Sequence, residues 1–157
     1  MPAREKIFSR ARLREEIARA RKRRRRVVFT SGCFDLLHVG HLRSFEEARS
    51  RGDLLVVGVN RDRRLRELKG PGRPVVPERQ RAEMVAGFGV VDYVVLFAED
   101  TAGPLIRFLA PDVVCKGGEY RGVETAEKRA IDDLGGEYVL LRQTPGVRTS
   151  RLIERLS

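Results

Sequence analysis

The sequence predicts an α/β fold in which an open parallel sheet carries helices on both faces. Three observations lead to this prediction. Apolar runs of strand length alternate with segments of helical periodicity along the chain. The runs are continuously apolar, which is typical of parallel strands that are covered on both faces. Polar or glycine-rich junctions follow the strands, and open parallel sheets bind ligands beyond these carboxyl ends.

The first predicted element is a short helix that leads into a strand. Ser9 is placed to cap the N-terminus of this helix. Three apolar residues at helical spacing form a narrow stripe along it: Leu13, Ile17 and Ala20. An apolar, β-branched run then ends at Thr30 and Ser31, and a new helical pattern begins near Gly40. The sequence therefore predicts a helix, a strand, a loop and a second helix.

A second strand is predicted from Asp53 to Asn60, where another continuous apolar run occurs. Gly52 just before it is expected to end the preceding helix as its C′ residue. Strand, helix and strand together form a βαβ unit, which is right-handed in parallel sheets. Residues 61–69 are strongly polar, and the Gly-Pro-Gly-Arg-Pro sequence at 70–74 breaks regular structure. We expect a mobile loop over the site here.

The alternation continues to the end of the chain. Further helices are predicted from about Pro77 to Phe88, after Asp100-Thr101, near Glu124 to Leu134 and from Thr149. Further strands are predicted at 92–97, at 113–116 before Gly117-Gly118, and at 137–141. The sequence has no internal repeat, low-complexity linker or domain boundary. Residues 1–157 are therefore expected to form one domain, with residues 1–26 as a basic N-terminal helical segment.

The net charge of +10 is concentrated in that N-terminal segment. Residues 1–26 hold twelve Lys or Arg and three Glu, whereas the other 131 residues hold twenty basic and nineteen acidic residues. The basic run from Arg21 to Arg26 has the composition of a site for nucleic acid or an anionic surface. No aromatic residue is interleaved with it, so it lacks the stacking platform of single-strand binders. We favour a solvated helix face over a nucleic-acid site.

The sequence also bears on the compartment. No apolar run approaches membrane-spanning length, and the N-terminus is charged where a signal peptide is apolar. Cys33 and Cys115 lack the spacing of metal ligands and cannot form a disulfide framework. We expect a soluble cytoplasmic protein with reduced thiols and no membrane partner.

The most informative stretch is residues 27–41, where a loop joins the first strand to the next helix. Such a junction collects backbone N–H groups and the positive end of a helix dipole, so it suits a phosphate. His38 and His41 are the only histidines, and their spacing lets both rings point to the same side. Gly40 removes a side chain that would keep a ligand from the backbone. The alternative is that one histidine caps the helix, the other lies on the surface and Gly40 serves a turn.

Residues 32–41, Gly-Cys-Phe-Asp-Leu-Leu-His-Val-Gly-His, resemble the signature of the HxGH nucleotidyltransferases. That superfamily includes cytidylyltransferases for choline phosphate and glycerol 3-phosphate, phosphopantetheine adenylyltransferase, and the adenylyltransferase of ADP-heptose synthesis. The resemblance implies a three-layer Rossmann-like fold, and relatives suggest a homodimer.

Further segments resemble the heptose 1-phosphate adenylyltransferase branch in order and spacing: residues 59–62, 68–70, 73–74, 80–81, 99–101 and 116–120. Residues 146–150 resemble the C-terminal phosphate-binding block of the superfamily. The similarity runs from about Lys6 to Leu156 and corresponds to the transferase half of proteins that some bacteria fuse to a sugar kinase. Ala102 stands where proline often occurs in this branch. Ser31 replaces the usual asparagine and Glu119 the common aspartate, at positions that could touch the acceptor sugar.

The resemblance implies that a substrate phosphate oxygen attacks the α-phosphorus of a nucleoside triphosphate and that pyrophosphate leaves. The nucleophile is already an anion, so the protein has to align two anions and stabilise charge rather than supply a strong base. The expected reaction transfers AMP from ATP to D-glycero-β-D-manno-heptose 1-phosphate and gives ADP-heptose. Two alternatives stay open. One is another pair of substrates, such as CTP with glycerol 3-phosphate or ATP with FMN. The other is a nucleotide- or nucleic-acid-binding module without catalysis.

By the same resemblance, His38 and His41 are the expected catalytic pair. The nucleotide is expected to contact Thr30, Ser31, Gly32, Phe34, His38, Gly40, His41, Arg148, Thr149 and Ser150. The acceptor or the leaving group is expected to contact Asp35, Asn60, Lys69, Arg73, Lys116 and Gly117. No metal ligands from the protein are expected, because Mg²⁺ should arrive with ATP.

Some of these residues also have simpler structural explanations. The sequence from Lys116 to Gly118 fits a strand end with a tight turn, and Thr149 or Ser150 fits a helix N-cap. Asp35 fits a loop or helix-entry cap, and Cys33 a packing residue. Three arginines fit an ordinary surface position: Arg73, Arg81 and Arg148.

Overall fold

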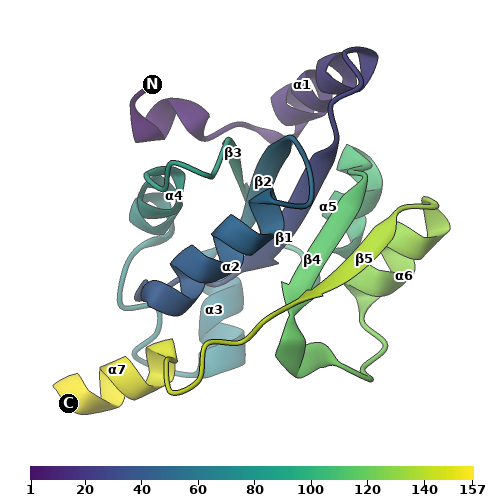
Figure 1. Cartoon of the computed structure of the whole chain (residues 1–157). Coiled ribbons are helices and arrows are strands. Elements are labelled where there is room, and N and C mark those ends of the chain that lie inside the picture. The colour runs from purple at the N-terminus through teal and green to yellow at the C-terminus, as the bar shows by residue number, and fades with distance from the viewer.

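A five-stranded parallel sheet lies at the centre of the computed structural model, which describes residues 1–157 (Figure 1). Its strands are β1 (Val27–Gly32), β2 (Leu54–Asn60), β3 (Tyr93–Phe97), β4 (Val113–Gly117) and β5 (Glu137–Leu141). They lie side by side in the order β3-β2-β1-β4-β5. The register of β1 runs from Val27 opposite Leu54 to Gly32 opposite Val59. This confirms the predicted fold class.

Helices cover both faces of the sheet, so the fold has three layers (Figure 1). On one face lie α1 (Arg10–Lys22), α5 (Gly103–Leu109) and α6 (Ala126–Asp133). On the other face lie α2 (Val39–Arg49) and α4 (Glu78–Ala86). The remaining helices are η1 (Ala3–Lys6), α3 (Asp62–Lys69), η2 (Gly118–Tyr120) and α7 (Thr149–Leu156).

The continuous apolar runs follow from this three-layer arrangement. Successive residues of a strand point to opposite faces. In β1, Val27 and Phe29 pack in one core while Val28 packs in the other. Both faces of the sheet are therefore buried. A strand that alternated apolar with polar residues would bury its polar side chains in one of the two cores.

The strand order places a topological switch point between β1 and β4. The chain runs outward from β1 through β2 to β3, and then returns to place β4 on the other side of β1. The loops that leave β1 and β4 therefore diverge toward opposite faces and leave a crevice between them. Open α/β sheets bind their ligands at such a point.

The first helix has the predicted cap and apolar stripe. The Ser9 side chain accepts a hydrogen bond from the Arg12 backbone N–H at 3.3 Å, and all three stripe residues are buried. Several basic side chains of residues 1–26 pair with carboxylates, as in Arg10 with Glu99 and Arg26 with Glu137. Most of the others are exposed, and residues 23–26 lie beyond the end of α1 at Lys22.

Gly52 does not end α2 as predicted. The helix ends at Arg49 and Ser50 is its C-cap residue, so Gly52 lies beyond the C′ position. A Cβ at residue 52 would lie 2.8 Å from the Arg26 carbonyl oxygen. Glycine is needed here because the chain passes close to the backbone that leads into β1, not because a helix has to stop.

The prediction of a mobile loop over residues 61–74 is wrong for residues 62–69, because they form α3. The backbone N–H of Arg61 donates to the carbonyl of Phe97 at 3.0 Å, which fixes the entry to the helix. Leu65 is completely buried and anchors the helix to the body. One buried leucine thus holds a helix whose other side chains are mostly charged. Irregular structure is confined to residues 70–77.

None of the helices combines the length and the apolar character that crossing a membrane would require.

Candidate active site

The carboxyl ends of the strands border a cleft of about 1070 Å³. Its wall is built from the β1–α2 loop, α3 with the segment that follows it, the β4–α6 connection and the β5–α7 connection. Every residue that the sequence assigned to the site lies on this wall: Thr30, Ser31, Gly32, Phe34, Asp35, His38, Gly40, His41, Asn60, Lys69, Arg73, Lys116, Gly117, Arg148, Thr149 and Ser150. The fold therefore gathers side chains that are up to 120 positions apart, Thr30 and Ser150, into one site.

The loop after β1 is shaped by Phe34. This residue has a positive φ of 50°, which turns the chain sharply after the strand. Its ring packs against His41 at 5.5 Å and against Phe45 at 5.2 Å between ring centroids. A Cβ at residue 32 would lie 2.9 Å from the Phe34 ring, so Gly32 leaves room for it. Phe34 thus supports the imidazole of His41 from the protein side.

His38 and His41 cap the N-terminus of α2. The Nδ1 atom of His38 accepts a hydrogen bond from the Gly40 backbone N–H at 3.1 Å. The Nδ1 atom of His41 accepts one from the His38 backbone N–H, also at 3.1 Å. The two rings stack with their centroids 3.9 Å apart. The simpler alternative was that one histidine caps the helix and the other lies on the surface. Its first half is correct, because histidine side chains do cap α2. Its second half is wrong, because both rings line the cleft.

These hydrogen bonds fix the tautomer of each histidine. A neutral imidazole whose Nδ1 accepts a hydrogen bond carries its proton on Nε2. Burial lowers the pKa of His38, and burial together with the neighbouring His38 lowers the pKa of His41 to about 4. Both rings are therefore neutral near pH 7. Neither Nε2–H group has a partner within the protein, so both are free to donate to a ligand.

Gly40 has a different role from the one predicted. A Cβ at residue 40 would lie 2.8 Å from Cε1 and 2.9 Å from Nδ1 of His38. The space above the glycine is thus filled by the ring of His38 itself. Gly40 permits the stacked arrangement of the two imidazoles, and its backbone N–H holds one of them in place.

Asp35 is turned toward the protein's own 73–76 segment. Its carboxylate accepts hydrogen bonds from Arg73 Nε at 2.7 Å, from the Val76 N–H at 2.8 Å and from the Val75 N–H at 2.9 Å. Burial alone would raise the pKa of Asp35, but these backbone and arginine donors lower it below its usual value. The sequence allowed Asp35 either to contact the acceptor or to cap a loop or a helix start. The loop cap describes the observed contact best, although the capped segment begins at Arg73, 38 residues further along the chain.

Arg81 is buried next to the cleft, although its sequence fits an ordinary surface arginine. Its exposed fraction is 0%. The guanidinium donates to the carbonyl oxygens of Cys33 and Val76 and to the Asp62 carboxylate. No local pattern marks it, because these partners come from three separate segments. Arg73 is also mostly buried, with 13% of its side chain exposed. Among the three arginines with a surface explanation, only Arg148 is exposed.

Lys116 at the end of β4 is more than part of a tight turn. Its Nζ lies 3.5 Å from a carboxylate oxygen of the buried Glu127 and 4.2 Å from the centre of the Tyr120 ring. The Glu127 carboxylate and the face of the Tyr120 ring therefore fix the position of the Lys116 ammonium in the cleft. Thr30 is engaged nearby, because its hydroxyl donates to the carbonyl of Cys115 at 3.1 Å.

The start of α7 lies beside the loop that joins β1 to α2, residues 33–38, which we call the histidine loop. The hydroxyl of Thr149 donates to the carbonyl of Leu36 at 2.7 Å. Arg148 is the N-cap residue and makes no capping hydrogen bond with its side chain, so the N-cap explanation of Thr149 and Ser150 is wrong. The first N–H groups of α7 therefore lack side-chain caps at the rim of the cleft, where they suit an anion.

The two other residues assigned to the acceptor side lie on the β2 side of the cleft. The Asn60 amide donates to Cys33 Sγ at 3.4 Å, and Lys69 is exposed at the C-terminus of α3. No cluster of three or more side chains suited to a metal ion is present.

Known proteins resemble this chain in sequence and fold. Residues 29–155 match the model of a family described as cytidylyltransferase-like. The bifunctional protein HldE of Syntrophotalea carbinolica is 45% identical over 151 residues, which are 96% of this chain and 31% of that protein. The HldE protein of Koribacter versatilis is 46% identical over 155 residues, or 98% of this chain and 32% of that protein. The chain thus spans about a third of the length of these relatives.

A solved structure also resembles this protein in fold. The lipopolysaccharide core biosynthesis protein from Thermoplasma volcanium superimposes with a TM-score of 0.62 at 28% identity. The match covers 76% of this chain and 97% of that protein.

Proposed function

Because the chain belongs to the cytidylyltransferase-like family of nucleotidyltransferases, we propose that it transfers AMP from ATP to a sugar 1-phosphate. The proposed acceptor is D-glycero-β-D-manno-heptose 1-phosphate, and the products are ADP-heptose and pyrophosphate. The single observation that carries the chemistry is the stacked pair of neutral histidines, whose Nε2–H groups are free donors in the cleft.

The reaction needs donors more than it needs a base. A phosphate oxygen of the acceptor supplies an electron pair to the α-phosphorus of ATP. The bond between that phosphorus and the bridging oxygen breaks, and pyrophosphate leaves with the electron pair. No proton has to be removed from the nucleophile, because it is already ionised. Negative charge builds up around the α-phosphate, where prearranged hydrogen-bond donors in a poorly hydrated site are most effective.

The chain offers a separate group of donors for each anion. We propose that His38 and His41 bind the α-phosphate, and that the start of α7 from Arg148 to Ser150 binds the β- and γ-phosphates. Lys69 and Arg73 line the α3 side of the cleft, and we propose that they bind the phosphate of the acceptor. Holding two mutually repelling anions in line is worth a large part of the barrier in such reactions.

Mg²⁺ is expected to accompany ATP. The cleft has no cluster of three metal-ligating side chains, and Mg²⁺ binds readily through substrate phosphates and water with few protein ligands. When bound, the ion would neutralise charge on the phosphates. The histidines and the α7 N-terminus would then orient the phosphate chain.

The choice of a heptose phosphate rests on resemblance. The relatives are named HldE, and the similar solved structure is named as a lipopolysaccharide core biosynthesis protein. The sequence from Lys116 to Tyr120 matches the block that we associate with the heptose branch. The homodimer that relatives suggest is part of the same proposal.

Pyrophosphate release with Mg²⁺ tests the proposal. ATP and CTP are each offered with heptose 1-phosphate, glycerol 3-phosphate and FMN. We expect release only with ATP plus heptose 1-phosphate, and a product with the mass of ADP-heptose. Release with another pair would overturn the acceptor and keep the reaction. Absence of release with every pair, together with salt-sensitive retention on nucleic acid, would favour the binding module instead.

A further inference from the structure

Two buried charged side chains join the histidine loop to the 73–76 segment. Asp35 lies in the loop between β1 and α2, and no part of its side chain is exposed. Arg81 lies on α4 and is also fully buried. The two do not bond to each other. Each instead binds atoms of the 73–76 segment, and Arg81 binds the histidine loop as well.

The oxygens of Asp35 are fully used by the protein. Together they accept four hydrogen bonds, from two backbone N–H groups of the 73–76 segment and from Arg73. Because the carboxylate is buried and already has these donors, it offers no free oxygen to a sugar hydroxyl or a metal ion. Its influence on a substrate has to pass through the groups that it holds.

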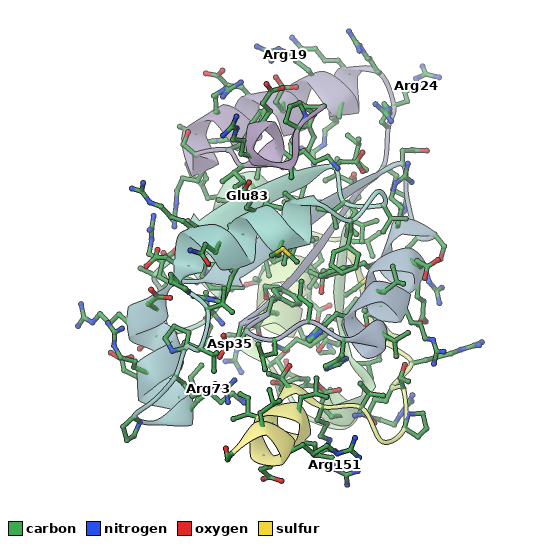
Figure 2. The ribbon with its side chains drawn as sticks, turned by 90° about the vertical axis from the view of Figure 1, so that its left-hand side faces the viewer. Arg19, Arg24, Asp35, Arg73, Glu83 and Arg151 are labelled. Carbon is green, nitrogen blue, oxygen red and sulfur yellow. The ribbon has the colours of Figure 1, made fainter.

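Arg73 is held in a way that leaves its binding atoms free. Its contact with Asp35 uses Nε alone, at 2.7 Å. The two terminal nitrogens have no partner within the protein, and the residue lines the cleft. Terminal guanidinium nitrogens are the donors that grip a phosphate from two sides. Figure 2 shows Asp35 and Arg73 next to each other, at the opposite end of the molecule from Arg19 and Arg24.

Arg81 fixes the other side of the same junction. Its Nε donates to the Val76 carbonyl at 2.9 Å, and NH1 donates to the Cys33 carbonyl. NH2 donates to Asp62 at the start of α3, at 2.7 Å. The segment is therefore bound through its N–H groups by Asp35 and through a carbonyl by Arg81, which leaves it little freedom to shift relative to the histidine loop.

We propose that Asp35 is a positioning residue for acceptor binding: it orients the guanidinium of Arg73 so that the terminal nitrogens bind the acceptor phosphate. This inference rests on the proposed function. Asp35 precedes His38 by three residues in the same loop. The group that holds the nucleophile and the groups that hold the α-phosphate thus share one rigid support, as alignment of two repelling anions requires.

The Arg73 contact goes beyond what anchoring the loop requires. The backbone N–H groups of Val75 and Val76 already bind Asp35 and would fix the segment without an arginine. A largely buried ion pair adds a desolvation cost and is weak evidence for stability by itself. The need to orient the terminal nitrogens of Arg73 toward a phosphate accounts for the ion pair between Asp35 and Arg73. Anchoring of the 73–76 segment alone does not account for it.

A double-mutant cycle tests the inference. The variants are Asp35→Asn, Arg73→Ala and both together, and Asp53→Asn is the matched control. Asp53 also accepts a backbone N–H, from Arg26, but lies outside the cleft. Asp35→Asn should raise the KM for the acceptor about tenfold or more, the scale of one hydrogen bond to a charged group. The KM for ATP should change by less than about twofold, and Asp53→Asn should leave both constants unchanged.

The combined variant decides whether Asp35 acts through Arg73. If it does, adding Asp35→Asn to Arg73→Ala should cost no further acceptor affinity, because the guanidinium to be oriented is gone. If the two losses multiply, or if Asp35→Asn raises both KM values equally, the positioning role is wrong. Arg73→Lys keeps the charge without the Nε donor, and it should resemble Arg73→Ala more than wild type.

A second measurement needs neither turnover nor a folded Asp35 variant. The side-chain ¹⁵N–¹H signal of Arg73 Nε, assigned by its loss in Arg73→Lys, is followed in wild-type protein while inorganic phosphate is added. We expect an Nε–H that exchanges slowly with water, and terminal NH₂ signals that shift with phosphate. A fast-exchanging Nε–H, or terminal signals that ignore phosphate, would overturn the inference. If no acceptor supported pyrophosphate release, the proposed function would fail and this titration would still decide the role of Asp35.

Discussion

Acidification should weaken the fold through His41, because the folded protein keeps this imidazole neutral where the unfolded chain would protonate it. Burial and the adjacent His38 lower the pKa of His41 from 6.5 to about 4. Between these values the unfolded state binds more protons than the folded state, so the free energy of unfolding falls as the pH falls. At about 1.4 kcal/mol per pKa unit, the loss is about 2 kcal/mol at pH 5 and levels off near about 3 kcal/mol.

Urea unfolding of the wild type and of His41→Asn, at about pH 7.5, 6 and 5, measures this effect. The asparagine oxygen can replace Nδ1 as the acceptor for the His38 backbone N–H, but it does not titrate. Carboxylates contribute equally to both proteins. The pKa of Asp35 is lowered, so the stability that it adds is lost only below the pH window of the test.

The wild type should therefore lose about 2 kcal/mol more than His41→Asn between about pH 7.5 and 5. Parallel profiles of the two proteins would contradict this prediction, because they would mean that His41 titrates alike in the folded and unfolded states. The folded protein would then not keep His41 neutral, and His38 and His41 would not form a pair of neutral hydrogen-bond donors.

Three further predictions concern single groups of the site. Arg81→Met should lower the free energy of unfolding by about 3 kcal/mol or more, because buried acceptors lose their partner, whereas Arg79→Met on the exposed side of α4 should change it by less than about 0.5 kcal/mol in urea unfolding. Gly40→Ala should depress turnover, because its Cβ would displace the His38 ring, while Gly89→Ala, which meets nothing within 4 Å, should keep wild-type rates. Long-range ¹⁵N–¹H spectra near pH 7 should show the proton of His38 on Nε2, and a proton on Nδ1 would contradict the capping hydrogen bond.

The sheet was predictable because its signal is local. Parallel strands covered on both faces have to be apolar at successive positions, as in the run from Leu54 to Val59. The cap at Ser9 and its apolar stripe are equally local, since a helix start depends on a few neighbouring residues. These elements could be found without the structure, whereas the order of the strands in the sheet, and with it the switch point, came from the structure.

The errors arose where distant residues decide the local structure. The segment of α3 is a charged stretch in the sequence, and the contacts that hold it are distant: Leu65 is buried against the body and Asp62 binds Arg81. Arg81 resembles any of the many arginines of this chain, yet its partners come from segments 5, 19 and 48 residues away. The position of Gly52 after a helical pattern predicts a helix end, and nothing in the sequence shows that the Arg26 carbonyl approaches it closely.

The site shows the same division. The motif identified the histidines and placed them on one side of a helix start, but it gave neither their tautomers nor their stacking, which depend on two backbone N–H groups. Asp35 and Arg73 were assigned separately to the acceptor. Their contact with each other spans 38 residues of sequence and depends on the path of the 73–76 segment.

The most direct test of the account is the turnover of His38→Ala and His41→Ala with saturating ATP and acceptor, measured as pyrophosphate release beside the dissociation constant for ATP. Each variant should lose at least about 100-fold in kcat, the usual cost of removing one donor from a developing anionic charge. ATP binding should weaken far less. Near-wild-type turnover of His41→Ala would contradict the account, because the chemistry would then not depend on the imidazole pair.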